Sequence, residues 1–202
     1  MSEVNPRQKE FFDRSAESWD MISVHDPDLI VELVSLLSLS GNESLLDVGT
    51  GTGVMIPYYS ERLNRGNITA MDYSEKMLEV AERKFPSSDR LRYVTMDVYE
   101  LDEQNRYDVI VCYSCFPHFP NKSDAVRILS GALNENGTLM IAHGISRRHV
   151  NNVHRECDAI ISNDLLPEMN AVAKMFKECG LSVTYTRDDE RTFTIIGKKG
   201  SE

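Results

Sequence analysis

A short apolar run that breaks into three alternating glycines constrains the fold of this chain more than any other stretch. Residues 44–54 read S-L-L-D-V-G-T-G-T-G-V. The apolar run suits a buried strand, and the glycines can adopt positive φ angles and let a ligand approach the backbone. Apolar residues then recur at helical spacing between residues 54 and 63. The stretch therefore predicts a strand, a ligand-binding loop and a helix N-terminus, whose free N–H groups favour a negatively charged group.

Strand and helix patterns alternate along the rest of the chain. Further strands are predicted at residues 67–71, 91–96, 107–113, 138–142, 181–186 and 192–197, and helices after Pro27 and Ser74 and at residues 123–133 and 164–179. The charged connection at residues 187–191 is too short for a crossover, so the last two strands should form an antiparallel hairpin. The pattern predicts an α/β fold in a single domain over residues 1–202: a doubly wound, mostly parallel seven-stranded sheet with an antiparallel C-terminal hairpin and helices on both faces.

The glycine spacing separates two classes of nucleotide ligand. Dinucleotide-binding loops have the pattern G-x-G-x-x-G, whereas this chain has G-x-G-x-G with Val54 where that fingerprint needs glycine. NAD is therefore disfavoured. Asp47 completes the pattern D-x-G-x-G-x-G, and here the sequence resembles the class I, Rossmann-like methyltransferases that use S-adenosylmethionine (SAM).

Two later strand ends extend this resemblance. Asp72 ends the second predicted strand, where a carboxylate can accept hydrogen bonds from both ribose hydroxyls; the alternative is an ordinary cap of the next helix. In the family, an acidic residue at the position of Asp97 accepts the adenine amino group, and the next residue, Val98, packs on the ring. The residues that the resemblance implies for cofactor binding are Asp47, Gly49, Thr50, Gly51, Gly53, Asp72, Tyr73, Met77, Asp97, Val98 and Tyr113.

The candidate catalytic residues follow the fourth and fifth predicted strands. Residues 114–119 resemble the family segment that often ends in His-His-Phe, but Pro117 replaces the first histidine, so only His118 carries over. Residues 143–163 depart from the plain fold and are predicted to be a substrate-facing insertion. A histidine can deprotonate a phenol, thiol or enol acceptor, with His143 preferred over His118 and His154.

Other roles are open for the same insertion. Arg147, or its neighbour Arg148, could bind an anionic acceptor through two parallel hydrogen bonds. The histidines could instead be surface or capping residues. They could also bind a metal together with Cys157 or Cys115, but the spacing matches no standard zinc module, and no metal is predicted.

The N-terminal residues 1–40 are predicted to form a helical lid region. The stretch F-F-D-R-S-A-E-S-W-D, which contains Phe11, Phe12 and Trp19, resembles the segment that folds over the SAM site in many small-molecule methyltransferases. The alternative is an amphipathic helix that only packs on the domain.

Composition limits the partners and the compartment. With 22 basic and 32 acidic side chains, the net charge of −10 argues against nucleic-acid binding. The absence of a long apolar run argues against membrane insertion, and four cysteines without a framework spacing suit a reducing, cytoplasmic location. Cys112 and Cys115 resemble a redox or metal pair, but strand alternation should point them apart.

The resemblance implies a SAM-dependent methyltransferase that transfers a methyl group to a small-molecule acceptor by in-line displacement, as a monomer or a homodimer. The alternatives are a non-catalytic sensor or partner subunit that binds SAM or S-adenosylhomocysteine, and a nucleotide-linked oxidoreductase, which Val54 disfavours.

Overall fold

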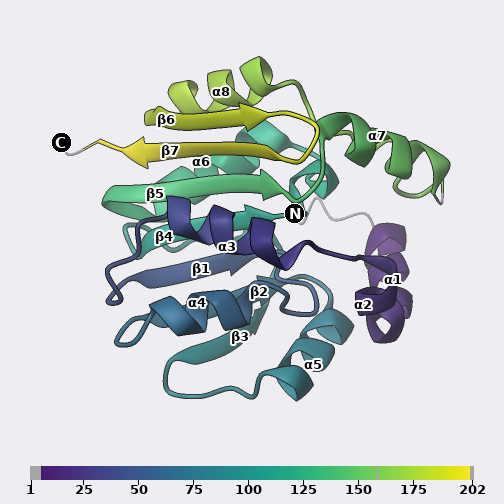
Figure 1. Cartoon of the computed structure of the whole chain (residues 1–202), viewed down its shortest axis with the longest axis horizontal. Helices are drawn as coiled ribbons and strands as arrows, with labels where there is room; N and C mark the ends of the chain where they lie inside the picture. The colour runs from purple at the N-terminus through teal and green to yellow at the C-terminus, as the bar shows by residue number, and fades with distance from the viewer. Residues whose placement is uncertain (1–5, 158, 201–202) are drawn as a thin grey trace.

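The computed structural model describes residues 6–157 and 159–200, and its centre is one seven-stranded sheet (Figure 1). The strand order is β3-β2-β1-β4-β5-β7-β6. The strands are β1 (Ser44–Val48), β2 (Asn67–Asp72), β3 (Leu91–Thr95), β4 (Tyr107–Tyr113), β5 (Leu133–His143), β6 (Leu181–Asp188) and β7 (Phe193–Lys199). The first five strands pair in parallel, and β7 is antiparallel to both β5 and β6. The predicted fold class and the C-terminal hairpin are confirmed.

Helices cover both faces of the sheet. The helices are α1 (Pro6–Ser15), α2 (Trp19–Ile22), α3 (Pro27–Leu36), α4 (Ile56–Arg62), α5 (Glu75–Lys84), α6 (Lys122–Ala132), α7 (Arg147–Glu156) and α8 (Met169–Glu178), with short 3-10 turns η1 (Ala16–Ser18), η2 (Val98–Glu100) and η3 (Phe116–His118). On one face α3 and α4 bury their apolar sides, and on the other α6 and α8 do so. Among the described residues, none of these helices has the length and apolar content needed to cross a bilayer.

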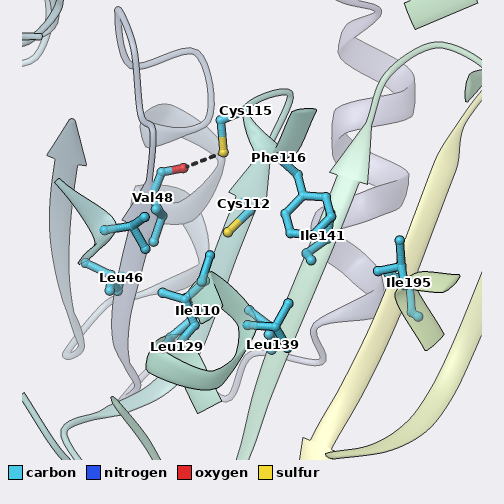
Figure 2. Packing of buried hydrophobic residues seen from close by; sticks show 14 of the residues in the cluster. Leu46, Val48, Ile110, Cys112, Cys115, Phe116, Leu129, Leu139, Ile141 and Ile195 are labelled. Atoms are coloured by element: carbon cyan, nitrogen blue, oxygen red, sulfur yellow. Dashed lines mark hydrogen bonds between the residues drawn. The ribbon is translucent and has the colours of Figure 1, made fainter. Parts of the chain in front are cut away.

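The core follows the two-residue period of the strands. Leu46 and Val48 pack toward α6 and α8, whereas Leu45 packs on the opposite face with α3 and α4. Strands buried on both faces can be apolar at successive positions, which is why residues 109–113 of β4 read as a continuous apolar run. Figure 2 shows the cluster beneath α6, in which Ile110 and Leu139 lie side by side.

Cys112 and Cys115 correct one prediction. Both thiols are reduced and buried in the same core cluster, although strand alternation predicted that they would point apart. The prediction was wrong because β4 ends at Tyr113, and Ser114 has a φ of +56°, which turns Cys115 back toward the sheet. Its Sγ donates to the carbonyl of Val48 over 3.1 Å (Figure 2). A hydrogen bond with Cys112, together with burial, raises the pKa of the Cys115 thiol.

Two helices begin later than predicted. The helix after the glycine loop begins at Ile56, because residues 51–55 form turns. The helix predicted to begin at residue 164 begins at Met169, after extended backbone at Glu168. Residues 1–5 of the predicted lid region, residue 158 of the predicted insertion and residues 201–202 lie outside the described residues.

The elements α1, α2 and α7 lie beyond the carboxyl ends of the parallel strands (Figure 1). Phe12 and Ala16 pack against Met77 and Val80 of α5, so the N-terminal segment covers the same edge at which the glycine loop lies.

Candidate cofactor and acceptor site

A cavity opens where the parallel strands end. Its volume is about 970 Å³, part of it open to solvent, which lies within the range of small-molecule sites. Its walls come from the loops after β1, β2, β3 and β4 and from the N-terminal segment. Of the predicted cofactor-binding residues, nine line this cavity: Gly49, Thr50, Gly51, Asp72, Tyr73, Met77, Asp97, Val98 and Tyr113. The chain therefore brings together residues that lie far apart in the sequence.

The glycine loop has one open position and two closed ones. Gly49, Gly51 and Gly53 have φ angles of +64°, +55° and +84°. A Cβ atom on Gly49 would lie 2.6 Å from Cβ of Cys115, and one on Gly53 would lie 2.8 Å from Cδ1 of Ile56. A Cβ on Gly51 would meet nothing closer than Nε1 of Trp19, at 4.0 Å. Gly51 thus leaves a space beside the backbone that a ligand can fill.

The loop is tied to the end of β2 through Asp72. Oδ2 of Asp72 accepts from the N–H of Gly51 and Oδ1 accepts from the N–H of Ser74, both over 2.8 Å. Burial raises the pKa of Asp72 to about 6, against the lowering effect of these two hydrogen bonds. Each carboxylate oxygen can accept a second hydrogen bond, so Asp72 suits a ligand with two adjacent hydroxyls.

Asp47 is buried beneath the glycine loop, where it stabilises the loop through hydrogen bonds, and it does not line the cavity. Its carboxylate accepts from the hydroxyl of Thr50 over 2.5 Å and from that of Tyr59 over 3.4 Å. Burial, with repulsion from Asp72, raises the pKa of Asp47 to about 7. Gly53 also lies outside the lining, packed against α4 and α5. Both residues hold the loop in place, and a direct contact with the cofactor stays a prediction.

Asp97 and Val98 form the wall after β3. Asp97 is the N-cap of η2, and its Oδ1 accepts from the N–H of Tyr99 over 3.2 Å. Met96, Val98 and Tyr99 place apolar surface next to this carboxylate. An acid beside an apolar wall suits a flat heteroaromatic ring that carries an amino group.

The three candidate histidines occupy different places. Only His118 lines the cavity. Its Nδ1 lies 2.8 Å from Oδ2 of Asp164, and its ring stacks on that of His154 at 4.9 Å between centroids. His154 lies behind it, and its Nδ1 bonds to the backbone carbonyl of Asp164.

His143, the preferred base in the sequence analysis, is buried at the end of β5 and does not line the cavity. Its ring lies 6.5 Å from that of Phe193, because the register of β5 on β7 brings these residues together. Its Nε2 has no hydrogen-bond partner within residues 6–157 and 159–200. Burial, with the nearby His118 and His154, lowers the pKa of His143 to about 3, which keeps the ring neutral.

The insertion contributes no described residue to the cavity wall. Nε of Arg147 lies 3.6 Å from Asp188, and the guanidinium also lies 3.9 Å from Glu168. Arg148 pairs with Glu190 at 3.1 Å, and Cys157 is exposed. Among the described residues no group of three or more His, Cys, Asp or Glu side chains is arranged to hold a metal. Anion binding by Arg147 stays a prediction.

Several wall residues had no individual signal in the sequence. Gln8, Ser23 and His25 line the cavity beside the aromatic residues Phe12 and Trp19. Nδ1 of His25 lies 3.1 Å from the hydroxyl of Tyr113. The path of the N-terminal segment brings these residues to the cavity. This path could not be predicted from the spacing of apolar residues in the sequence.

Comparison with known proteins fits this geometry. Residues 46–139, which run from β1 into β5, match the methyltransferase domain family. This part of the chain is therefore similar to a methyltransferase domain, and the sheet around it has the class I methyltransferase fold. SAM is the cofactor of class I methyltransferases, and the open glycine, the buried Asp72 and the Asp97 wall fit its nucleoside.

The methyltransferase domain has relatives with several names. A malonyl-[acyl-carrier protein] O-methyltransferase of Marinomonas sp. (strain MWYL1) is 37% identical over 95 residues, which is 47% of this chain and 35% of that protein. An uncharacterized protein of Haemophilus influenzae is 31% identical over 67% of this chain and 55% of its own length. The chain thus spans only about a third to a half of these curated relatives.

Solved structures share the fold over nearly the whole chain. A chain of the complex between the Haloferax volcanii Trm112 methyltransferase activator and a methyltransferase has a TM-score of 0.76 at 17% identity, covering 94% of this chain and 98% of that one. A SAM-dependent methyltransferase from Aquifex aeolicus has a TM-score of 0.70 at 17% identity, covering 97% and 99%. These likenesses extend the methyltransferase fold to the N-terminal helices and the C-terminal hairpin.

Proposed function

We propose that this methyltransferase domain transfers a methyl group from SAM to a small-molecule acceptor. The observation that carries the proposal is the meeting of three strand ends at one cavity: Gly51 after β1, Asp72 at the end of β2 and Asp97 after β3. Gly51 offers backbone without a side chain, Asp72 offers two acceptor oxygens for the ribose, and Asp97 offers one for the adenine amino group.

The charge of the cavity supports a cationic ligand. Its lining carries two carboxylates, Asp72 and Asp97, and among the described residues it carries no lysine or arginine. When bound, SAM supplies an electrophilic methyl group on a positively charged sulfur. Carboxylates in a partly buried wall favour such a cation over an anionic ligand.

Positioning supplies most of the rate enhancement in this proposal. Holding donor and acceptor in a reactive geometry contributes roughly 7–11 kcal/mol, and a general base adds about 10²- to 10⁴-fold. The chain contributes to positioning through the loop that Asp47 and Asp72 hold in place. It excludes water with the aromatic rings of Phe12 and Trp19, which supports a lid function for the N-terminal segment.

Calorimetry of Asp72→Asn tests the cofactor site. The amide keeps the shape of the side chain but replaces one acceptor oxygen with a donor, so we expect the affinity for SAM to fall at least tenfold. Asp102→Asn is the matched control, because Asp102 is exposed and outside the cavity. Equal affinities of the Asp72→Asn variant and the unmodified protein would overturn the proposed site.

A further inference from the structure

A hydrogen-bonded network surrounds the one candidate histidine that lines the cavity. Oδ2 of Asp164 accepts from Nδ1 of His118 over 2.8 Å and from Nε2 of Gln8 over 2.6 Å. The side chains are well packed, since His118 is 12% exposed and Asp164 19% exposed. Asp164 lies between β5 and α8, and Gln8 lies in α1, so the network joins three separate parts of the chain.

This network selects one tautomer of His118. An ionised carboxylate only accepts hydrogen bonds, so Nδ1 of His118 must carry the proton that points to Asp164. The neutral ring then has its lone pair at Nε2, which makes no hydrogen bond with any of the described residues. The backbone carbonyl of Asp164 likewise requires a proton on Nδ1 of His154. A single residue thus fixes the tautomers of both stacked rings.

The surrounding groups keep His118 in place as a proton acceptor. Lys122 donates to the carbonyls of Pro117 and Phe119, on either side of His118, over 2.8 and 3.0 Å. Burial, with the nearby His118, lowers the pKa of His154, which favours the neutral form of that ring. Four titratable groups among the described residues interact directly with His118: Asp164, His154, His143 and Asp72. Lys122 acts on it indirectly, through its electrostatic interaction with Asp164.

Gln8 connects this network with the cofactor side of the cavity. Its Oε1 accepts from the hydroxyl of Tyr73 over 3.3 Å, while its Nε2 donates to Asp164. Gln8 is buried, and α1 also places the ring of Phe12 against that of His118, at 5.0 Å between centroids. The network is therefore complete only when α1 lies over the cavity.

The wall composition bears on the kind of acceptor. Methylation of a carboxylate needs no base, because the nucleophile is already ionised, and a carboxylate bound in a cavity is normally paired with a cation. The described lining contains no lysine or arginine but does contain His118, Phe12, Tyr99 and Phe119. An imidazole base beside aromatic rings suits a planar acceptor with a weakly acidic hydroxyl, a phenol or an enol.

We propose that His118, oriented by Asp164 and Gln8, takes the proton of a phenol or enol acceptor. The inference rests on the proposed function and deepens it. The hydroxyl proton moves to Nε2 of His118, and the oxygen lone pair forms the bond to the methyl carbon. The electrons of the broken carbon–sulfur bond stay on sulfur, so S-adenosylhomocysteine, the methyl ether and a protonated imidazole result. Asp164 and Gln8 are positioning residues that stabilise this imidazolium and do not touch the reacting atoms.

Nitrogen-detected NMR of the full chain tests the orientation without any acceptor. We expect the ¹⁵N signals of His118 to report the Nδ1–H tautomer in the unmodified protein and loss of that preference in Asp164→Asn, because the amide can turn either a donor or an acceptor to the ring. Asn163→Ala, at an exposed neighbour, is the control that should leave the signals unchanged. An Nε2–H tautomer in the unmodified protein would overturn the inference.

Turnover tests the acceptor class. We expect methylation of 4-methylumbelliferone, a hydroxyl probe, and none of monoethyl malonate, a carboxylate probe, as followed by release of S-adenosylhomocysteine. Asp164→Asn should lower kcat for the hydroxyl probe by about 10- to 100-fold and change the pH profile, and Asp164→Glu should restore part of both. Gln8→Ala should lower kcat with little change in KM. Glu10 is exposed on the same helix, so Glu10→Ala is the control and should leave kcat unchanged.

The outcomes separate this inference from the function on which it rests. Failure of the unmodified protein to bind SAM would overturn the proposed function, and the inference with it. Binding of SAM with methylation of the carboxylate probe alone, or of neither probe, would overturn the hydroxyl acceptor and leave the cofactor site standing. Unchanged kcat and pH profile in Asp164→Asn would overturn its positioning role.

Discussion

Within the glycine loop, three residues with similar φ angles are fixed by different neighbours. Gly49 is held by Cys115 and Gly53 by α4, whereas Gly51 faces the cavity. The same alternating pattern therefore contains two positions that the packing requires and one, Gly51, that the packing leaves open to the cavity.

Alanine substitutions should separate these two requirements. Gly51→Ala carries only the cost of a side chain at positive φ, about 1–2 kcal/mol of unfolding free energy, but its methyl group enters the cavity and should weaken SAM binding. Gly49→Ala has a similar φ and adds a 2.6 Å clash with Cys115, so it should lose more stability. Urea unfolding and calorimetry of both variants check this; a smaller loss of stability in Gly49→Ala would contradict it.

Single residues also show where sequence reasoning stops. Asp72, Asp97 and Gly51 could be predicted because motif spacing fixes them at strand ends. His143 was predicted to reach the cavity from its place at a strand end, but the register of β5 on β7 turns it into the core. Asp164 was predicted to begin a helix, but it lies in the loop before α8. Its contact with His118, 46 residues away, could not be predicted, because a loop has no regular spacing of apolar residues.

At the scale of elements, the N-terminal segment is held over the cavity by a mixed set of contacts. Arg83 pairs with Glu17 at 2.7 Å and Lys84 with Asp20 at 2.5 Å, while Asp13 accepts from the hydroxyl of Ser74 over 2.6 Å. Exposed ion pairs contribute little, about 0–1 kcal/mol each. The buried Phe12 packs on α5, so apolar burial contributes more to the attachment of this segment than its exposed ion pairs do.

Trp19 is the sole tryptophan of the chain and lies over the open side of Gly51. We expect SAM to change its fluorescence emission, because the cofactor would displace water beside the indole and the covering segment would tighten. A titration followed by fluorescence should give the same affinity as calorimetry, and Asp72→Asn should show no change at the same concentrations. Calorimetric binding without any change in emission would place the ligand elsewhere.

At the scale of the whole molecule, two buried carboxyls make stability depend on pH. The pKa of Asp47 is raised by burial to about 7 and that of Asp72 to about 6, from an ordinary value of 3.8. Because the folded state favours the protonated form of each acid, the stability they contribute is full below pH about 4 and is lost as pH rises through 6 to 7.

Chemical unfolding at pH 5.5 and pH 8 checks this dependence. The unmodified protein should be less stable at pH 8 by an amount on the order of 1–4 kcal/mol, and Asp47→Asn should reduce that difference, since an amide does not ionise. The comparison uses the difference between the two pH values, because the amide also changes the hydrogen bonds from Thr50 and Tyr59. An equal difference in both proteins would show that Asp47 ionises as freely in the folded state as in the unfolded chain.

The sheet itself could be predicted almost completely from the sequence. The strands that alternate with helices fix a parallel order, and the five-residue charged connection fixes the final hairpin. Element starts such as Ile56 and Met169 could not be predicted, because turns after the glycine loop and before α8 interrupt apolar patterns that read as continuous helix.

The strand order has a consequence for how the polypeptide acquires its structure during synthesis. The strand β7 is made after β5 and β6 yet lies between them, so β5 is paired only with β4, and β6 with no strand of the sheet, until β7 has been made. The half that carries Gly51, Asp72 and Asp97 needs only β1 to β4 and can pair while the ribosome is still translating. Until then the open edge of β5 is a site for wrong pairing with other nascent chains, and the late arrival of β7 closes it.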